Sequence, residues 1–156
     1  MTYDLRIERM IDAPPDVVFD AFVEPEAQKF LYGNPEEPAW TIESELDLRV
    51  GGTWTIAFGK SGEEPYRETN VFTEVDRPRR IVFDLIMAMG AEGRDRGGQD
   101  FGTNVTVTFE ERDGKTLLTI VETGFERKDD RDGSVEDGWP RILDALERVV
   151  AERRST

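Results

Sequence analysis

Residues 134–150 read SVEDGWPRILDALERVV, and this stretch decides the fold class. Its apolar residues recur every three or four positions, the spacing that places side chains along one side of an α-helix. The stripe consists of Val135, Trp139, Ile142, Leu143, Leu146, Val149 and Val150. The sequence therefore predicts a long amphipathic C-terminal helix. Because a proline inside a helix removes a hydrogen bond, Pro140 predicts either a kink near Trp139 or a helix that begins around Asp137.

The segments that precede this helix alternate apolar and polar residues, the pattern of half-buried β-strands. They span residues 40–49, 53–58, 65–75, 81–87, 103–110 and 115–123, and an earlier alternating segment spans residues 3–11. Short turns connect most of them, and Asp113-Gly114 is the clearest hairpin signal. Consecutive strands joined by short turns predict an antiparallel meander.

Two short helices are expected between the first strand and this meander. Residues 14–22 begin with proline and carry Asp16 in the first turn, where both residue types favour a helix start. Glu24-Pro25-Glu26 repeats this signal for a second helix that ends near Leu31.

Length and charge limit the classes of partner. The chain has 156 residues, the size of one ordinary domain, so a single domain over residues 1–156 is expected. Its formal net charge of −14 repels phosphate backbones and anionic lipids, which argues against nucleic-acid and membrane partners. No stretch approaches the roughly 18 apolar residues of a membrane span, and no signal-peptide core follows Met1, so we expect a cytoplasmic location.

The chain contains no cysteine and no histidine. Disulfides, thiolate catalysis, zinc–sulfur sites and imidazole-based triads or metal sites are therefore excluded. We expect no metal site and no cofactor, and we assign no catalytic residue. Any catalysis would rest on carboxylates, tyrosine, lysine or arginine.

Five short blocks, spread over nearly the whole chain, carry a family resemblance. They are Ala13-Pro14-Pro15-Asp16-Val17-Val18-Phe19; Arg49-Val50-Gly51-Gly52-Thr53-Trp54; Glu74-Val75 with Pro78 and Arg80-Ile81-Val82; Thr116-Leu117-Leu118-Thr119 with Gly124-Phe125; and Gly138-Trp139 with Leu143 and Leu146. The blocks and the order of elements resemble the helix-grip superfamily of START domains and the birch-pollen allergen, in the branch related to the activator of the heat-shock-protein-90 ATPase. This resemblance implies an α+β helix-grip fold, in which a curved antiparallel sheet of six or seven strands grips the C-terminal helix. Asn70 stands where this family often has a glycine.

The inward-facing residues of such a sheet meet the C-terminal helix. A helix about 10 Å across does not fill a strongly curved sheet unless bulky side chains close the ends, so plain core packing and a ligand-binding hollow are both open. The candidate lining residues of such a hollow are Trp54, Phe58, Tyr66, Phe83, Leu85, Met87, Trp139, Leu143 and Leu146.

The leading functional hypothesis is non-enzymatic binding of a small, mainly apolar molecule, because these residues are nearly all hydrophobic or aromatic. The resemblance suggests the alternative, a chaperone-regulating or other protein-interaction module, which would need an exposed apolar patch. The second alternative is a cyclase- or hydrolase-type enzyme on the same fold, for which Tyr66, Glu68 and Asp84 are acid–base candidates. The chain is expected to be a monomer or a homodimer.

Three polar segments have competing interpretations. Residues 49–54 form either a tight glycine turn or an anion site near Arg49. Residues 88–102 hold five glycines and form either a surface loop or a lid over the pocket. The charged residues 126–132 are interpreted as a solvated linker into the last helix.

Overall fold

The computed structural model describes residues 1–24, 27, 31, 40–60, 62–88 and 101–155. These residues form a seven-stranded antiparallel sheet in the order β1-β7-β6-β5-β4-β3-β2. Its strands are β1 (Tyr3–Ile11), β2 (Trp40–Leu46), β3 (Thr53–Lys60), β4 (Tyr66–Asp76), β5 (Arg80–Ala88), β6 (Phe101–Arg112) and β7 (Lys115–Phe125). Strands β2 to β7 are consecutive neighbours, so the predicted meander is confirmed, and β1 lies beside β7.

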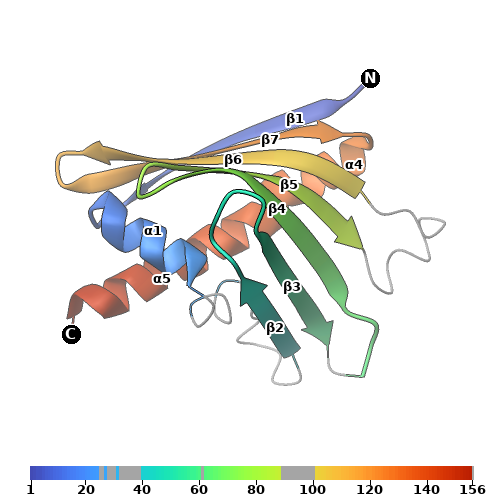
Figure 1. The fold of residues 1–156 in the computed structure, drawn as a ribbon, viewed down its shortest axis with the longest axis horizontal. Helices are drawn as coiled ribbons and strands as arrows, with labels where there is room; N and C mark the ends of the chain where they lie inside the picture. The colour runs from blue at the N-terminus through green and yellow to red at the C-terminus, as the bar shows by residue number, and fades with distance from the viewer. Residues whose placement is uncertain (25–26, 28–30, 32–39, 61, 89–100, 156) are drawn as a thin grey trace.

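Helix α1 (Pro15–Val23) follows β1, and the C-terminal helix α5 (Trp139–Ser155) runs along the concave side of the sheet, with α1 near its C-terminal part (Figure 1). The curved sheet and the long helix that it encloses are those of the helix-grip fold, as predicted. Of the second short helix expected near Leu31, only Ala27 and Leu31 lie within the described residues, and both are helical and buried.

The C-terminal helical region begins earlier than predicted. Helix α4 (Lys128–Gly133) is followed directly by a π-helical turn, η1 (Ser134–Gly138), and then by α5. The interpretation of residues 126–132 as a linker is therefore wrong, as is a helix start around Asp137. Acidic residues in the first turn of α4 and a Lys128–Asp132 ion pair of 3.3 Å favour the helix.

The π-helical turn lies where the sequence predicts an irregularity. It ends at Gly138, and the Trp139 N–H donates to the carbonyl of Ser134, five residues earlier. Pro140 has no N–H to donate, and its ring would clash with the carbonyl four residues before it in a regular α-helix. A wider turn at this point relieves that clash and places Trp139 at the start of α5.

Alternation along the strands separates an inner face from an outer face. On β5, Ile81, Phe83 and Leu85 are buried against the helices, whereas Asp84 and Ile86 are exposed on the other side. The parity predicted for this strand is confirmed. The same alternation places Tyr66, Glu68, Asn70 and Phe72 of β4 on the inner face.

Aromatic rings fill the core beside α1. Phe22 meets Trp54 and Phe109 edge-on at centroid distances of 5.9 Å each, and Trp54 lies 5.6 Å from Phe83. The six rings of this cluster are almost completely buried, and they belong to Phe19, Phe22, Trp54, Phe72, Phe83 and Phe109. This half of the interior is close-packed core.

Ion pairs hold α1 in place. Arg77 pairs with Asp20 of α1, and its guanidinium lies 5.4 Å from the centroid of the Phe19 ring. Arg153 of α5 pairs with Glu24, the residue that caps the C-terminal end of α1. Within the described residues, no helix is long and apolar enough to cross a membrane.

Candidate functional site

Polar side chains occupy the inner face of the sheet beyond the aromatic cluster. Glu68 and Asn70 continue the inward register of β4 past Phe72, and Thr103 and Glu122 extend it across β6 and β7. All four are buried, with exposed fractions of 5%, 0%, 8% and 3%. Since a buried polar group without a partner costs about 1–3 kcal/mol, the partners of these residues decide what the site does.

Glu122 accepts two hydrogen bonds. Trp139 Nε1 donates to Oε1 over 2.8 Å, and Thr103 Oγ1 donates to Oε2 over 2.6 Å. Burial raises the pKa of the Glu122 carboxyl, and the donations from Thr103 and Trp139 act against this rise. The network ties the first residue of α5 to β6 and β7, so Glu122 positions Trp139 over the sheet.

Asn70 lies at the centre of the second polar group. Its Nδ2 donates to Glu68 Oε2 over 2.7 Å and to the carbonyl of Trp54 over 3.3 Å. Both neighbours are acceptors, which fixes the orientation of the amide. The other amide atom, Oδ1, is buried and has no hydrogen-bond partner in the described part of the chain.

An aromatic wall lies next to this group. The rings of Phe58 and Tyr66 stack at a centroid distance of 5.3 Å with an interplanar angle of 20°. Phe58 and Tyr66 face each other across β3 and β4, and Met87 of β5 faces Glu68. Phe58, Tyr66 and Met87 are only partly buried, unlike the neighbouring Leu85.

The predicted lining residues therefore divide into three groups. Phe58, Tyr66, Leu85 and Met87 come together beside Glu68 and Asn70. Trp54 and Phe83 belong to the aromatic cluster instead, where core packing accounts for them. On α5, Leu143 and Leu146 are fully buried, and Trp139 is 6% exposed. Whether any of these side chains touches a ligand stays a prediction.

The sequence analysis missed Asn70, Thr103 and Glu122 as inward-facing polar residues. A signal for Glu122 was present, because it shares strand parity with Leu118 and Ile120, two core residues of β7. An acidic residue in the inward register of a strand must either pair or shift its pKa.

Asp84 is not part of the site. It is exposed on the outer face of the sheet, and its Oδ1 accepts a 3.0 Å hydrogen bond from Asn104 Nδ2. Tyr66 and Glu68 lie on the inner face, so the proposed acid–base role of Asp84 beside Tyr66 is wrong. Alternation along β5 is the reason, since Phe83 and Leu85 take the inward positions.

Turn geometry explains the glycines of residues 49–54. Gly51 has a φ of +81°, and a Cβ on Gly52 would lie 2.1 Å from the Asp47 carbonyl oxygen. Arg49 Nε donates to Asp47 Oδ2 over 2.7 Å, so its guanidinium pairs with a carboxylate of the chain itself. These contacts favour the tight turn over an anion site. The proposed lid lies almost entirely at residues 89–100, outside the described residues.

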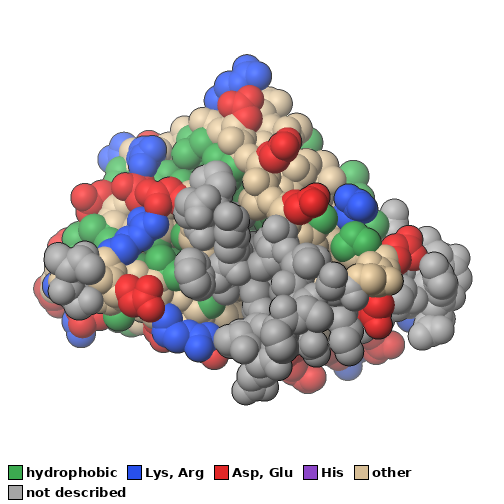
Figure 2. Space-filling model, turned by 90° about the horizontal axis from the view of Figure 1, so that it is seen from below, with side chains coloured by type: hydrophobic (Ala, Val, Ile, Leu, Met, Phe, Trp, Pro, Cys, Tyr) green, Lys and Arg blue, Asp and Glu red, His purple; other side chains and the backbone are tan. Residues whose placement is uncertain are grey.

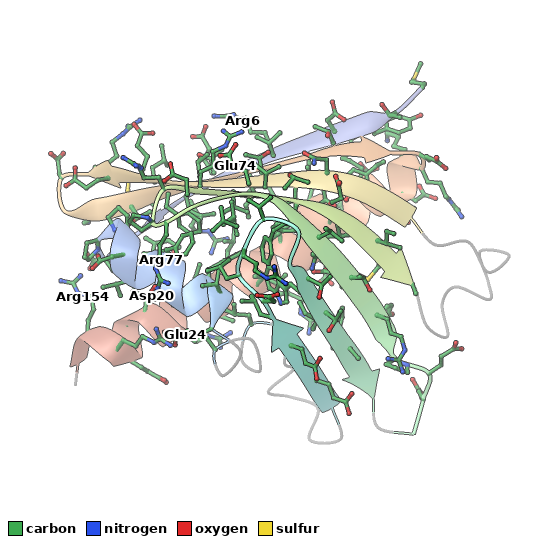
Figure 3. All side chains as sticks on the ribbon, viewed as in Figure 1. Arg6, Asp20, Glu24, Glu74, Arg77 and Arg154 are labelled. Atoms are coloured by element: carbon green, nitrogen blue, oxygen red, sulfur yellow. The ribbon has the colours of Figure 1, made fainter. Side chains whose placement is uncertain are left out.

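The outer face of the sheet carries a groove of about 410 Å³. Its arginines are matched by carboxylates, with Arg6 2.9 Å from Glu8 and Arg112 3.1 Å from Glu110. Arg6 and Glu74 lie on this face in Figure 3. These pairs are solvent-exposed and contribute little energy. Among the described residues, no group of three or more acidic side chains could hold a metal ion.

Comparison with known proteins places the chain among helix-grip proteins. It belongs to the family of Activator of Hsp90 ATPase homolog 1-like proteins, whose model matches residues 12–151. A crystal structure of a protein from Rhizobium loti is similar with a TM-score of 0.75 and 27% identity, over 95% of this chain and 96% of that chain. No curated protein matches.

Two further solved structures show the same fold. A protein from Chromobacterium violaceum has a TM-score of 0.75 and 21% identity, over 94% of this chain and 96% of that chain. The AHSA1-like protein from Aeromonas hydrophila has a TM-score of 0.70 and 23% identity, over 97% of this chain and 94% of that chain. A fold of this kind supports a ligand-binding or regulatory module in general.

Proposed function

We propose that this protein binds a small, mainly apolar molecule between the sheet and α5, beside Phe58, Tyr66 and Met87. The observation that carries the proposal is the change in packing along the inner face. Trp54 and Phe83 are sealed in the aromatic cluster, whereas Phe58, Tyr66 and Met87 keep exposed surface although they face inward. Apolar surface at a concave, inward-facing position favours ligand binding over core packing.

The mixture of side chains also fits a ligand site. The stacked Phe58–Tyr66 pair offers a flat apolar wall, and Glu68 and Asn70 add a few polar atoms beside it. Small-molecule sites combine a mostly apolar lining with few polar groups that orient the ligand. The hydrogen bond from Trp139 to Glu122 fixes the start of α5 against the inner face of the sheet.

A matched pair of substitutions tests the location. Met87 and Ile86 are neighbours on β5 with opposite orientation, and Ile86 is 57% exposed on the outer face. Met87→Trp adds bulk to the inner face, and Ile86→Trp adds the same bulk outside. The uncharged, apolar dye Nile red is the probe, and its affinity is measured by fluorescence and by the stabilisation RT ln(1 + [L]/Kd) in thermal unfolding.

We expect Met87→Trp to weaken Nile red binding at least about tenfold, which corresponds to about 1.4 kcal/mol, and Ile86→Trp to leave it unchanged. Equal affinities for the two variants would place the dye elsewhere. Failure of the parent protein to bind Nile red and a panel of similar apolar probes would refute the proposed function.

A further inference from the structure

Exposure falls in steps along the inner face of β4. The inward residues of this strand are, in order, Tyr66, Glu68, Asn70 and Phe72. Tyr66 is partly exposed, whereas the next three are 5%, 0% and 1% exposed. The inner face is therefore open to a ligand at Tyr66 and closed at Asn70.

The two flanking strands close at the same level. Phe58 of β3 and Met87 of β5, which face the outer part of β4, are partly exposed. Trp54 of β3 and Leu85 of β5 face Asn70 directly, and they are 1% and 5% exposed. The row formed by Trp54, Asn70 and Leu85 is thus the inner end of the proposed site on all three strands.

Aromatic rings fill the space behind Asn70. The Phe72 ring stacks on Trp54 at a centroid distance of 6.1 Å and meets Phe83 edge-on at 6.0 Å. Trp54 and Phe83 also contact each other, with their centroids 5.6 Å apart. A ligand that enters from the side of Tyr66 therefore reaches Asn70 before it meets this close-packed core.

Two hydrogen bonds hold the Asn70 side chain in place. Its Nδ2 donates to the Trp54 carbonyl on β3 and to Glu68 Oε2, so the amide cannot turn aside without losing both. The other amide atom, Oδ1, is buried and has no hydrogen-bond partner in the described structure. Because a buried acceptor without a donor costs stability, packing alone would favour an apolar residue of similar size at this position. A role in the site gives a reason for the amide.

We propose that Asn70 is the end wall of the site and thereby determines the length of the apolar ligand that the site accepts. This inference rests on the proposed function and adds a specificity-determining residue to it. Tyr66 and Asn70 are four residues apart on β4, and a strand rises about 3.3 Å per residue, so the accessible stretch is about 13 Å long. Ligands up to this length bury their whole apolar body, and a longer chain gains nothing from its additional atoms.

A homologous series of 1-alkanols, from butanol to dodecanol, measures the length of the site. Their affinities come from displacement of Nile red from the full chain. We expect the affinity to rise about fourfold with each methylene, which corresponds to about 0.8 kcal/mol for each buried CH₂. The rise should stop at the alcohol whose chain reaches Asn70, and longer alcohols should bind equally well.

Two substitutions at Asn70 should move this plateau in opposite directions. Asn70→Ala shortens the end wall, so we expect the rise to continue for about two more methylenes and the longest alcohols to bind about fifteenfold more tightly than to the parent. Asn70→Leu places a larger side chain there, so the plateau should begin at a shorter alcohol. Val71→Ala is the matched control, because Val71 is the next residue of β4 and is 39% exposed on the outer face. Its plateau should stay that of the parent. Cooperative urea unfolding identifies the folded variants, and either substitution at Asn70 suffices for the test.

The outcomes separate this inference from the proposed function. A plateau that begins at the same alcohol in the parent and in the Asn70 variants, or that Val71→Ala moves equally, would overturn the role of Asn70 and leave the apolar site intact. Affinities that rise without a plateau in the parent, or alcohols that do not displace bound Nile red, would overturn it as well. Failure of the parent to bind Nile red or any alcohol would overturn the proposed function together with this inference.

Discussion

The hydrogen bond between Trp139 and Glu122 gives the sharpest test of the site's construction. Trp139→Phe keeps a buried aromatic ring and removes Nε1–H, the donor that lies 2.8 Å from Glu122 Oε1, together with part of the indole ring. A hydrogen bond to a charged group contributes about 1.5–3 kcal/mol, and the lost ring atoms of a side chain that is 6% exposed add about 1 kcal/mol. We therefore expect a loss of about 2.5–4 kcal/mol in the free energy of unfolding near neutral pH.

This loss should depend on pH, with a sign that the structure determines. Donation from Trp139 lowers the pKa of Glu122, which burial raises above its ordinary value of 4.5. A raised carboxyl pKa means that the stability linked to the bound proton is fully present below pH 4.5 and is lost as the pH rises through the folded-state pKa. Removal of the donor raises the folded-state pKa further, so the deficit of Trp139→Phe grows as the pH rises.

Urea unfolding followed by far-ultraviolet circular dichroism, between about pH 5 and about pH 8, measures this deficit. Leu146→Ala is the control, because the side chain of Leu146 is aliphatic and fully buried on the same helix. Its deficit should not change with pH. A Trp139→Phe deficit that is also constant over this range would refute the assignment of Glu122 as the acceptor whose charge the indole N–H stabilises.

Other changes follow from the same contacts. Glu122→Gln imitates the protonated acid and should flatten the fall in stability above pH 4.5, which pH-dependent unfolding of the variant would show. Leu146→Ala should cost about 2–5 kcal/mol, and a cost below about 1 kcal/mol in urea would contradict its full burial. Gly52→Ala should cost more than about 2 kcal/mol in the same assay, because its Cβ would lie 2.1 Å from the Asp47 carbonyl oxygen.

The sequence predicted those helices and strands in which apolar residues repeat with a single regular spacing. The stripe from Trp139 to Val150 identified α5, and alternation on β5 placed Phe83 and Leu85 inward. A side chain of fixed parity cannot change face without a register shift, so such predictions hold once the strand exists. The start of the C-terminal helical region was not predicted, because Lys128–Gly133 reads as a charged surface segment without an apolar stripe.

The partners within the site could not be read from the sequence. Trp139 and Glu122 lie on different elements, 17 residues apart in the sequence. Only the packing of α5 across β6 and β7 brings the indole to the carboxylate. Asn70 and Glu68 are two residues apart on β4, so strand alternation alone puts them on the same face of the sheet. Whether Asn70 Oδ1 finds a hydrogen-bond partner depends on every group around it, and no local sequence pattern specifies those groups.

The distribution of apolar surface favours a ligand site over a protein-docking face. The large exposed hydrophobic residues in the described parts of the chain are Met1, Met10 on β1, Val50 in a turn, Val71 on β4, Ile86 on β5 and Val135 in η1. Val71 and Ile86 are neighbours on adjacent strands of the outer face, and the others lie on separate elements. Charged side chains of both signs are interspersed with hydrophobic ones on the described part of the lower face (Figure 2). Docking faces gather apolar residues into a contiguous patch of a few hundred Å². Phe58, Tyr66 and Met87, by contrast, lie together on three adjacent strands of the inner face, an arrangement that favours the proposed small-molecule site.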